Sequence, residues 1–218
     1  SNVAPALKEM PMLEGFMPTA PLILVRFRRW DDVMKLPQPD ASMPLTTAVW
    51  RFARAMAYAS TGKLDDAARE RQLFTASVNS LPADTPYGSL NTAADVFRVA
   101  TATLDARMAD ARGDLNAAAA SLRLAAEAQD ALNYDEPPPW FLPARESLGG
   151  VLMRAGKAVE AEQAFRDDLK RNPHNGRSLF GLRESLKAQG KRREARAVNR
   201  EYLRAWQYAD TSLRLADL

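Results

Sequence analysis

Cysteine is absent from the 218 residues of the chain, and histidine occurs once, as His174. The first absence excludes disulfide bridges, thiolate nucleophiles and thiolate metal sites. The second would leave a transition-metal site dependent on carboxylates, which no local spacing brings together. His174 lies in the turn Asn172-Pro173-His174-Asn175, where a lone histidine is typically a solvated or capping residue. We therefore predict no metal site.

The sequence also lacks the short motifs of common enzymes. Its ten glycines are scattered and form no phosphate-binding loop, nucleophile elbow or dinucleotide fingerprint. The acidic pairs Asp65-Asp66 and Asp167-Asp168 are adjacent in sequence, so on a helix their side chains point about 100° apart. Carboxylates in that geometry do not form a general acid/base couple. We expect a chain with no enzymatic activity and no cofactor.

Long apolar runs and strand-like patterns are scarce. No stretch approaches the roughly 18 to 20 apolar residues that a membrane span needs. Aromatic residues make up 8% of the chain, and no long run of alternating β-branched residues appears. Alanine dominates the apolar residues, which favours helices that pack closely. These features predict an all-α protein without a transmembrane segment.

The chain opens with Ser1-Asn2-Val3 and shows neither an initiator methionine nor a signal peptide. Such a start is typical of the residues left by a cleaved expression tag, so we expect a piece of a longer protein. A cytoplasmic location is favoured, and an exported one stays open in case a signal sequence was removed. The oligomeric state is left open.

A 34-residue period is the strongest positive signal. Five pairs of like residues are separated by 34 positions: Leu148 and Leu182, Leu152 and Leu186, Gly156 and Gly190, Ala161 and Ala195, Leu169 and Leu203. Glycine after a helix supplies a left-handed turn, and a small alanine lets two helices approach. The period predicts an α-α superhelix of about five antiparallel helix pairs, in which each pair buries its apolar face against its neighbours.

Three regions follow from this pattern, all within one continuous solenoid. Residues 1–44 contain a truncated N-terminal end and a degenerate helix pair, at Leu22 to Phe27 and Arg29 to Met34. Residues 45–141 hold two divergent repeat-like units with long connections. Residues 142–218 hold two regular units and a C-terminal capping helix.

The two divergent units are recognised by their turn glycines, Gly62 and Gly113. The distance in sequence from each of these glycines to the turn glycine of the next unit is longer than in the regular region. Residues 80–89 and 133–139 are rich in turn-forming residues and absorb the extra length.

These patterns resemble the tetratricopeptide repeat family. The residues that match its consensus are Leu148, Gly149, Leu152, Gly156, Ala161, Phe165 and Pro173. The chain also resembles the C-terminal part of large bacterial tetratricopeptide proteins of unassigned function, through Val25 to Asp31, Tyr134 to Trp140 and Asn175 to Gly181. The resemblance implies a helical-repeat fold, whereas such folds host many unrelated binding roles.

The resemblance also implies a groove for a partner. In tetratricopeptide arrays the first helix of each pair lines the concave face. The groove positions that this implies here are Glu146, Met153, Arg177, Phe180, Glu184 and Lys187. A groove that mixes charged and apolar side chains suits a peptide or helix with apolar anchors.

The segment Tyr134 to Phe141 contains three consecutive prolines, which impose an extended backbone. Under a structural interpretation, Tyr134, Trp140 and Phe141 cover the seam between two repeats. Under a functional interpretation, the acidic and aromatic rim loop, with Asp135 and Glu136, touches a ligand at the edge of the groove. The structural interpretation is favoured, because aromatic residues beside prolines usually serve packing.

A basic stripe runs along the last predicted helix. Arg192, Arg196, Arg200 and Arg204 recur every four residues, so they share one helical face. The whole chain carries a net charge of only +3, too small by itself to imply nucleic acid. The stripe is favoured as a solvated outer face, and a site for an anionic surface stays open.

The sequence therefore supports two hypotheses about function. The first is a non-catalytic scaffold that binds a peptide or partner domain in the concave groove. The alternative is an adaptor for an anionic surface or nucleic acid through the basic stripe. Of the two, the scaffold with a protein or peptide partner is favoured.

Overall fold

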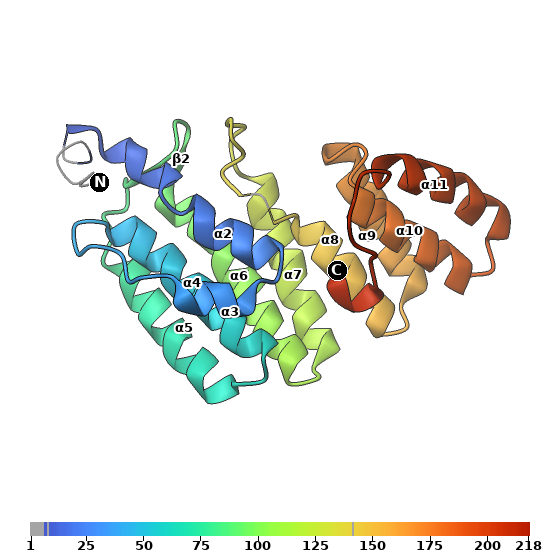
Figure 1. Cartoon of the computed structure of the whole chain (residues 1–218), viewed down its shortest axis with the longest axis horizontal. Helices are drawn as coiled ribbons and strands as arrows, with labels where there is room; N and C mark the ends of the chain where they lie inside the picture. Colours follow the sequence, from blue (N-terminus) through green and yellow to red (C-terminus); the bar gives the residue numbers. More distant parts are fainter. Residues whose placement is uncertain (1–6, 8, 141) are drawn as a thin grey trace.

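The chain folds into antiparallel helix pairs that follow one another along the molecule. The structure is a computed structural model and describes residues 7, 9–140 and 142–218. Within this part, the long pairs are α4 (Pro44–Ser60) with α5 (Leu64–Asn79), α6 (Ala93–Ala111) with α7 (Leu115–Asp130), α8 (Ala144–Arg154) with α9 (Ala158–Arg171), and α10 (Gly176–Ala188) with α11 (Arg192–Ala205). They run from left to right in Figure 1. The predicted all-α class is confirmed.

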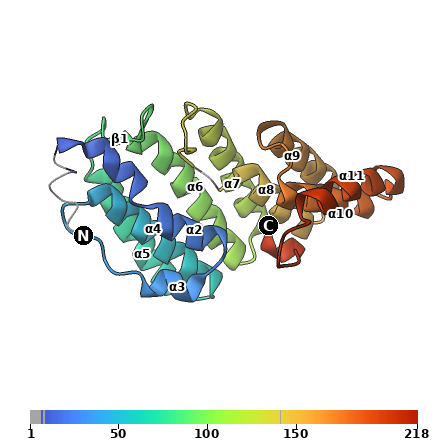
Figure 2. The ribbon, with the colours of Figure 1, turned by 45° about the horizontal axis from the view of Figure 1, so that its top comes forward.

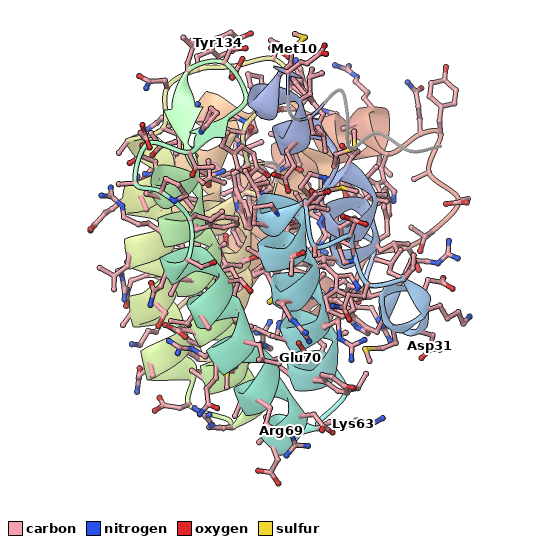
Figure 3. All side chains as sticks on the ribbon, turned by 90° about the vertical axis from the view of Figure 1, so that its left-hand side faces the viewer. Met10, Asp31, Lys63, Arg69, Glu70 and Tyr134 are labelled. Atoms are coloured by element: carbon pink, nitrogen blue, oxygen red, sulfur yellow. The ribbon has the colours of Figure 1, made fainter. Side chains whose placement is uncertain are left out.

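Figure 3 looks along the stack from the side of α4 and α5. Met10 and Tyr134 lie at one end of the helices, and Lys63 and Arg69 lie at the other. In this part of the stack, α4, α5, α6 and α7 therefore run roughly side by side, with their connections at two opposite edges.

The degenerate N-terminal pair forms, but it does not extend the stack. After the 3₁₀ helix η1 (Pro11–Phe16), α2 (Thr19–Arg26) and α3 (Trp30–Lys35) pack against α4. In Figures 1 and 2, α2 lies across α4 and α6 and points toward α8. The buried Leu22, Val25 and Val33 join the core of α4, so this short pair covers the first helices. Residues 1–6 and 8 of the predicted region 1–44 lie outside the described residues.

The 34-residue spacing reappears in the geometry of the turns. Gly156 and Gly190 adopt φ values of 72° and 74°, in the left-handed region that glycine enters without steric cost. The residue after each glycine closes the turn in the same way. Lys157 N donates to Leu152 O at 2.9 Å, and Lys191 N donates to Leu186 O at 2.9 Å. The two regular units are thus alike in their turns as well as in their sequence.

One aromatic ring joins three helices of the regular units. Phe165 on α9 is completely buried, and it packs against Gly149 on α8 and Gly181 on α10. A Cβ atom at Gly149 would lie 2.4 Å from Phe165 Cζ, and one at Gly181 would lie 2.2 Å from it. These glycines are therefore required by close packing, since real Cβ atoms do not approach so near.

The two insertions lie where the sequence places them, between α5 and α6 and between α7 and α8. The first forms a short antiparallel pair, β1 (Pro86–Tyr87) with β2 (Asn91–Thr92). Asn91 joins the two insertions, because its Nδ2 donates to Asn133 O at 3.0 Å and its Oδ1 accepts from Asn133 N at 2.8 Å. The connections are therefore tied to each other at one edge of the stack.

Buried aromatic residues of the helix pairs and their connections include Trp50, Trp140 and Phe165. Tyr58 and Trp206 are only half-buried. Each has a polar end with a partner near the surface, since Tyr58 Oη accepts from Arg54 and Trp206 Nε1 donates to Thr211 O at 2.7 Å.

The predicted C-terminal capping helix does not form. After α11, residues 206–214 are turns and irregular backbone, and only the short 3₁₀ helix η2 (Leu215–Asp217) follows. Serine, threonine and aspartate in this stretch compete with helical hydrogen bonding, which explains the departure from the prediction. The segment instead turns back toward α8 (Figure 1).

Candidate functional site

A charged cluster lies on the first-helix face, which we define as the face formed by α4, α6, α8 and α10. Its centre is Glu146 on α8, whose side chain is 1% exposed. Arg26, at the end of α2, donates to this carboxylate from Nη1 at 2.7 Å and from Nη2 at 2.9 Å. Arg177 Nε on α10 and Asn175 Nδ2 donate to it at 2.6 and 3.0 Å. Elements far apart in the sequence therefore meet at one buried carboxylate.

Two further arginines extend the cluster along α6 and α8. Arg107 Nη1 and Arg154 Nη2 lie 3.2 and 2.8 Å from Asp110 Oδ2. Arg107 Nε is buried and has no hydrogen-bond partner within the described residues. Arg28, in the turn between α2 and α3, lines the same hollow as Arg107. We call the following residues the arginine cluster: Arg26, Arg28, Arg107, Arg154 and Arg177.

The C-terminal segment of the chain lies against this cluster. We define the tail as residues Leu215 to Leu218. Leu218 is 2% exposed and lies between α6 and α8, where a Cβ atom at Gly150 would come within 2.7 Å of its Cβ. Small voids of about 30 and 50 Å³ remain beside it. Figure 2 shows the C-terminal end beside α8.

The tail is held mainly through its backbone. Arg28 Nη2 donates to Leu218 O at 3.1 Å, and Arg28 Nη1 donates to Ala216 O. Arg177 Nη2 donates to the carbonyl oxygen of Asp217. The Asp217 carboxylate also lies 3.8 Å from Arg28 Nη1. Two arginines therefore bind three consecutive backbone oxygen atoms of the short 3₁₀ turn that ends in Leu218.

Burial and neighbouring positive charge shift the pKa values of the cluster residues. Burial lowers the pKa of Arg28 to about 10, with a further contribution from the neighbouring Arg107 and Arg177. Burial also lowers the pKa of Arg107 from its ordinary value. For Glu146, burial alone would raise the pKa, but the adjacent guanidinium groups outweigh it and lower the value. The buried carboxylate is therefore ionised at neutral pH.

The predicted groove residues are distributed over more than one environment. Glu146 and Arg177 lie together in the charged cluster, as described above. Met153 is half-buried on α8. Phe180 is 7% exposed and packs against the ring of Tyr202, with ring centroids 5.8 Å apart, so it belongs to the core between α10 and α11.

The remaining two groove positions lie further along α10. Glu184 is half-buried and accepts from Arg183 Nε at 2.7 Å and Lys187 Nζ at 2.9 Å. Lys187 is exposed. The structure thus brings Glu146 and Arg177 together, whereas Glu184 and Lys187 form a separate pair.

The rim loop divides between core and surface. Trp140 is 3% exposed and packs edge-on against Phe52, with ring centroids 5.4 Å apart. Tyr134 is 77% exposed and Glu136 is exposed. Asp135 accepts from Ser89 N at 2.7 Å and so joins the two insertions. The packing interpretation holds for Trp140 and not for Tyr134, and Phe141 lies outside the described residues.

The basic stripe and His174 are at the surface. Arg192, Arg196, Arg200 and Arg204 are all exposed along α11. Considering only the residues that the structure describes, none of the four forms an ion pair with an acidic side chain. His174 is exposed in its turn, with a φ of 64°.

Sequence reasoning missed most of the arginine cluster. Arg26 and Arg28 lie in the arginine-rich stretch Val25 to Asp31, which carries a resemblance to other proteins but no motif of a binding site. Arg107 and Arg154 carry no local motif. The tail, Leu215-Ala216-Asp217-Leu218, has only one acidic side chain and two leucines as a sequence signal. Where these residues lie could not be predicted without the fold.

Comparison of the sequence with protein-family models gives no match, and comparison with curated proteins gives no significant match. Within the described ranges, no helix has the length and apolar content needed to cross a membrane. In that same part of the chain, no group of three or more His, Cys, Asp or Glu side chains is arranged to hold a metal ion.

Proposed function

We propose that the chain is a non-catalytic, tetratricopeptide-type scaffold that binds a peptide or partner domain on the first-helix face. In the arrays that the sequence resembles, this face is the concave groove. One observation supports the proposal: the face holds the short C-terminal segment of the chain through the hydrogen bonds from Arg28 and Arg177 to three consecutive backbone oxygen atoms. Donors aimed at main-chain carbonyls suit peptides of varied sequence.

Affinity capture from cells that naturally produce the chain tests this function. We expect a discrete protein to be retained at both low and high salt, and to be lost when Arg28 is replaced in the variant Arg28→Asn. Arg69→Ala is the matched control, because Arg69 on α5 is 68% exposed and lies at an outer turn of the stack (Figure 3). A protein retained equally by all three forms would contradict the assignment to this face.

The basic stripe supports a second candidate function, an adaptor for an anionic surface or nucleic acid. Its four arginines are exposed on one helix without acidic partners in the described part of the chain. Binding through such a stripe would fall steeply with salt, because each contact releases counterions. Replacement of Arg192, Arg196 and Arg200 by glutamate would abolish binding to a DNA duplex or to phosphatidylserine vesicles. Binding that persists after this change would exclude the stripe as the site that binds the anionic surface or nucleic acid.

A further inference from the structure

The arginine cluster carries more positive charge than its own acidic residues balance. Its five arginines lie beside the carboxylates of Glu146 and Asp110, and Asp168 accepts from the same Asn175 Nδ2 as Glu146, so the arginines outnumber these carboxylates by two. Asp217 of the tail offsets this excess only in part, because its nearer partner is Arg214. Since charges in a partly buried site are screened less than surface charges, the excess favours an anionic ligand.

The tail shows which features of a ligand the site accommodates. Its three backbone oxygen atoms accept from Arg28 and Arg177, and its last leucine lies between α6 and α8. The Asp217 carboxylate lies 3.8 Å from Arg28 Nη1 and is also paired with Arg214, whose Nη2 is 3.1 Å away. Leu218 is almost completely buried there. The site therefore combines a contact for an acidic side chain, a row of backbone donors and an apolar hollow for the next side chain.

Arg28 is held in a backbone conformation that arginine rarely adopts. Its φ is 55°, in the left-handed region that costs most residues about 1 kcal/mol or more. Strained residues of this kind persist where surrounding contacts hold them, and they gather at ligand sites. The contacts that hold the Arg28 side chain are those with the tail.

The connection between α11 and the tail permits exchange. Residues 207–212 are all exposed, so this part of the connection is not packed into the core. A segment tethered by a short flexible connection competes with ligands in solution at an effective concentration of about millimolar. The tail therefore weakens the binding of a second segment without preventing it.

We propose that the arginine cluster is a binding site for an acidic peptide segment of a partner protein, in which an aspartate or glutamate directly precedes a leucine. The tail occupies this site in cis until such a segment displaces it. This inference rests on the proposed scaffold function and adds the chemistry of its ligand.

A fluorescent peptide with the sequence of residues 209–218 tests the proposal by anisotropy titration of the 218-residue chain. The tail variant carries Asp217→Ser and Leu218→Ser, which remove the two side chains that compete with the peptide. We expect the tail variant to bind the peptide at least about tenfold more tightly than the unchanged chain. Adding Arg28→Asn to the tail variant should abolish this binding, whereas adding Arg69→Ala should leave it unchanged.

Equal binding of the peptide to the tail variant and the unchanged chain would overturn the proposal, provided that helix content is retained. If the tail variant does not fold, hydrogen exchange of the unchanged chain takes its place. Excess peptide should then speed exchange of the amides of residues 215–218, and unaltered rates would overturn the proposal. A dimer formed by exchanged tails would overturn it too, by identifying a second copy as the occupant.

The outcomes distinguish this inference from the proposed function. A partner captured through the first-helix face with equal yield by the unchanged chain and by the tail variant would leave the scaffold function standing and contradict the role of the tail. Peptide binding that requires Arg28, without any captured protein, would establish the site and contradict the wider scaffold function.

Discussion

At the scale of single residues, buried carboxylates link the helices of the regular units. Glu162 on α9 accepts from Lys191 Nζ and Gln189 Nε2, both at 2.7 Å, and from Arg166 on its own helix. Burial alone would raise the pKa of Glu162, but these hydrogen bonds outweigh it and lower the pKa from 4.5 to about 2. The ionised form is thus favoured by the fold, and its contribution to stability depends on pH.

We predict that Glu162→Gln lowers the free energy of unfolding by about 1–2 kcal/mol at pH 7. This is less than the lowered pKa alone would imply, because Lys191 and Arg166 are 39% and 41% exposed and solvent screens them. The folded-state pKa lies below the unfolded one, so the stabilisation is complete above about pH 4.5 and is lost as the pH falls toward 2.

Urea denaturation at pH 7, 5 and 3.5 measures this effect. The difference between the unchanged chain and Glu162→Gln should shrink at the lowest pH. Glu160→Gln is the control on the same helix, because Glu160 is 50% exposed and its pair with Arg123 should contribute little at any pH. A difference that is constant with pH would show that lost packing, and not charge, explains the effect.

At the scale of the helix, the contact of Phe165 with two glycines sets the spacing of α8, α9 and α10. Alanine favours a helix over glycine by about 1 kcal/mol, which alone would make Gly181→Ala stabilising. A methyl group at this position would instead overlap the Phe165 ring, which is completely buried and is already in close contact with Gly149 as well. We therefore expect the steric overlap to outweigh the gain in helix propensity and to make Gly181→Ala destabilising.

We predict that Gly149→Ala and Gly181→Ala each lower the free energy of unfolding by about 1–3 kcal/mol. Phe165→Leu, combined with Gly181→Ala, should recover part of the loss, because the smaller side chain leaves room for the methyl group. A double-mutant cycle by chemical denaturation measures this coupling. Additive effects of the two changes would contradict the contact.

Local features of the helices could be predicted from the sequence. The left-handed turns at Gly156 and Gly190 and the burial of Phe165 follow from residues close together in the chain. The position of α2 could not be predicted, because it depends on the pair of Arg26 with Glu146, which are separated by 120 positions. Nothing in the local pattern of either residue identifies the other as its partner.

For the candidate site, the resemblance to tetratricopeptide repeats implied Glu146 and Arg177 as groove positions, and the structure places the two side chains together. It assigned Phe180 to the groove as well, whereas the side chain is turned into the contact with Tyr202. The sequence predicts a capping helix at the end of region 142–218, whereas the structure has the tail docked against α8. Its docking depends on donors from α2 and α10 that only the assembled fold brings together.

At the scale of the whole molecule, stability is expected to vary along the stack. In a linear array each pair contacts only its neighbours, so a terminal pair has fewer supporting contacts. The last helix, α11, buries Ala195 and Tyr202, whereas the central α6 buries ten of its residues and packs against α4, α5 and α7. Opening of α11 should therefore expose little apolar surface.

We predict that amides of α11 exchange with solvent through local opening, at a free energy below that of global unfolding. Amides of α6 should exchange only on global unfolding. Native-state hydrogen exchange in low concentrations of denaturant measures both. Equal values for α6 and α11 would show that the whole chain opens as one cooperative unit.

The burial of Leu218 also determines where a reporter can be attached. A fluorophore, an affinity handle or a fused domain joined after Leu218 would have to leave the space between α6 and α8, where this residue is 2% exposed. Such an addition would pull the segment out of its place and change the surface being studied. Tyr208, which is 93% exposed in the preceding connection, accepts a label without that disturbance.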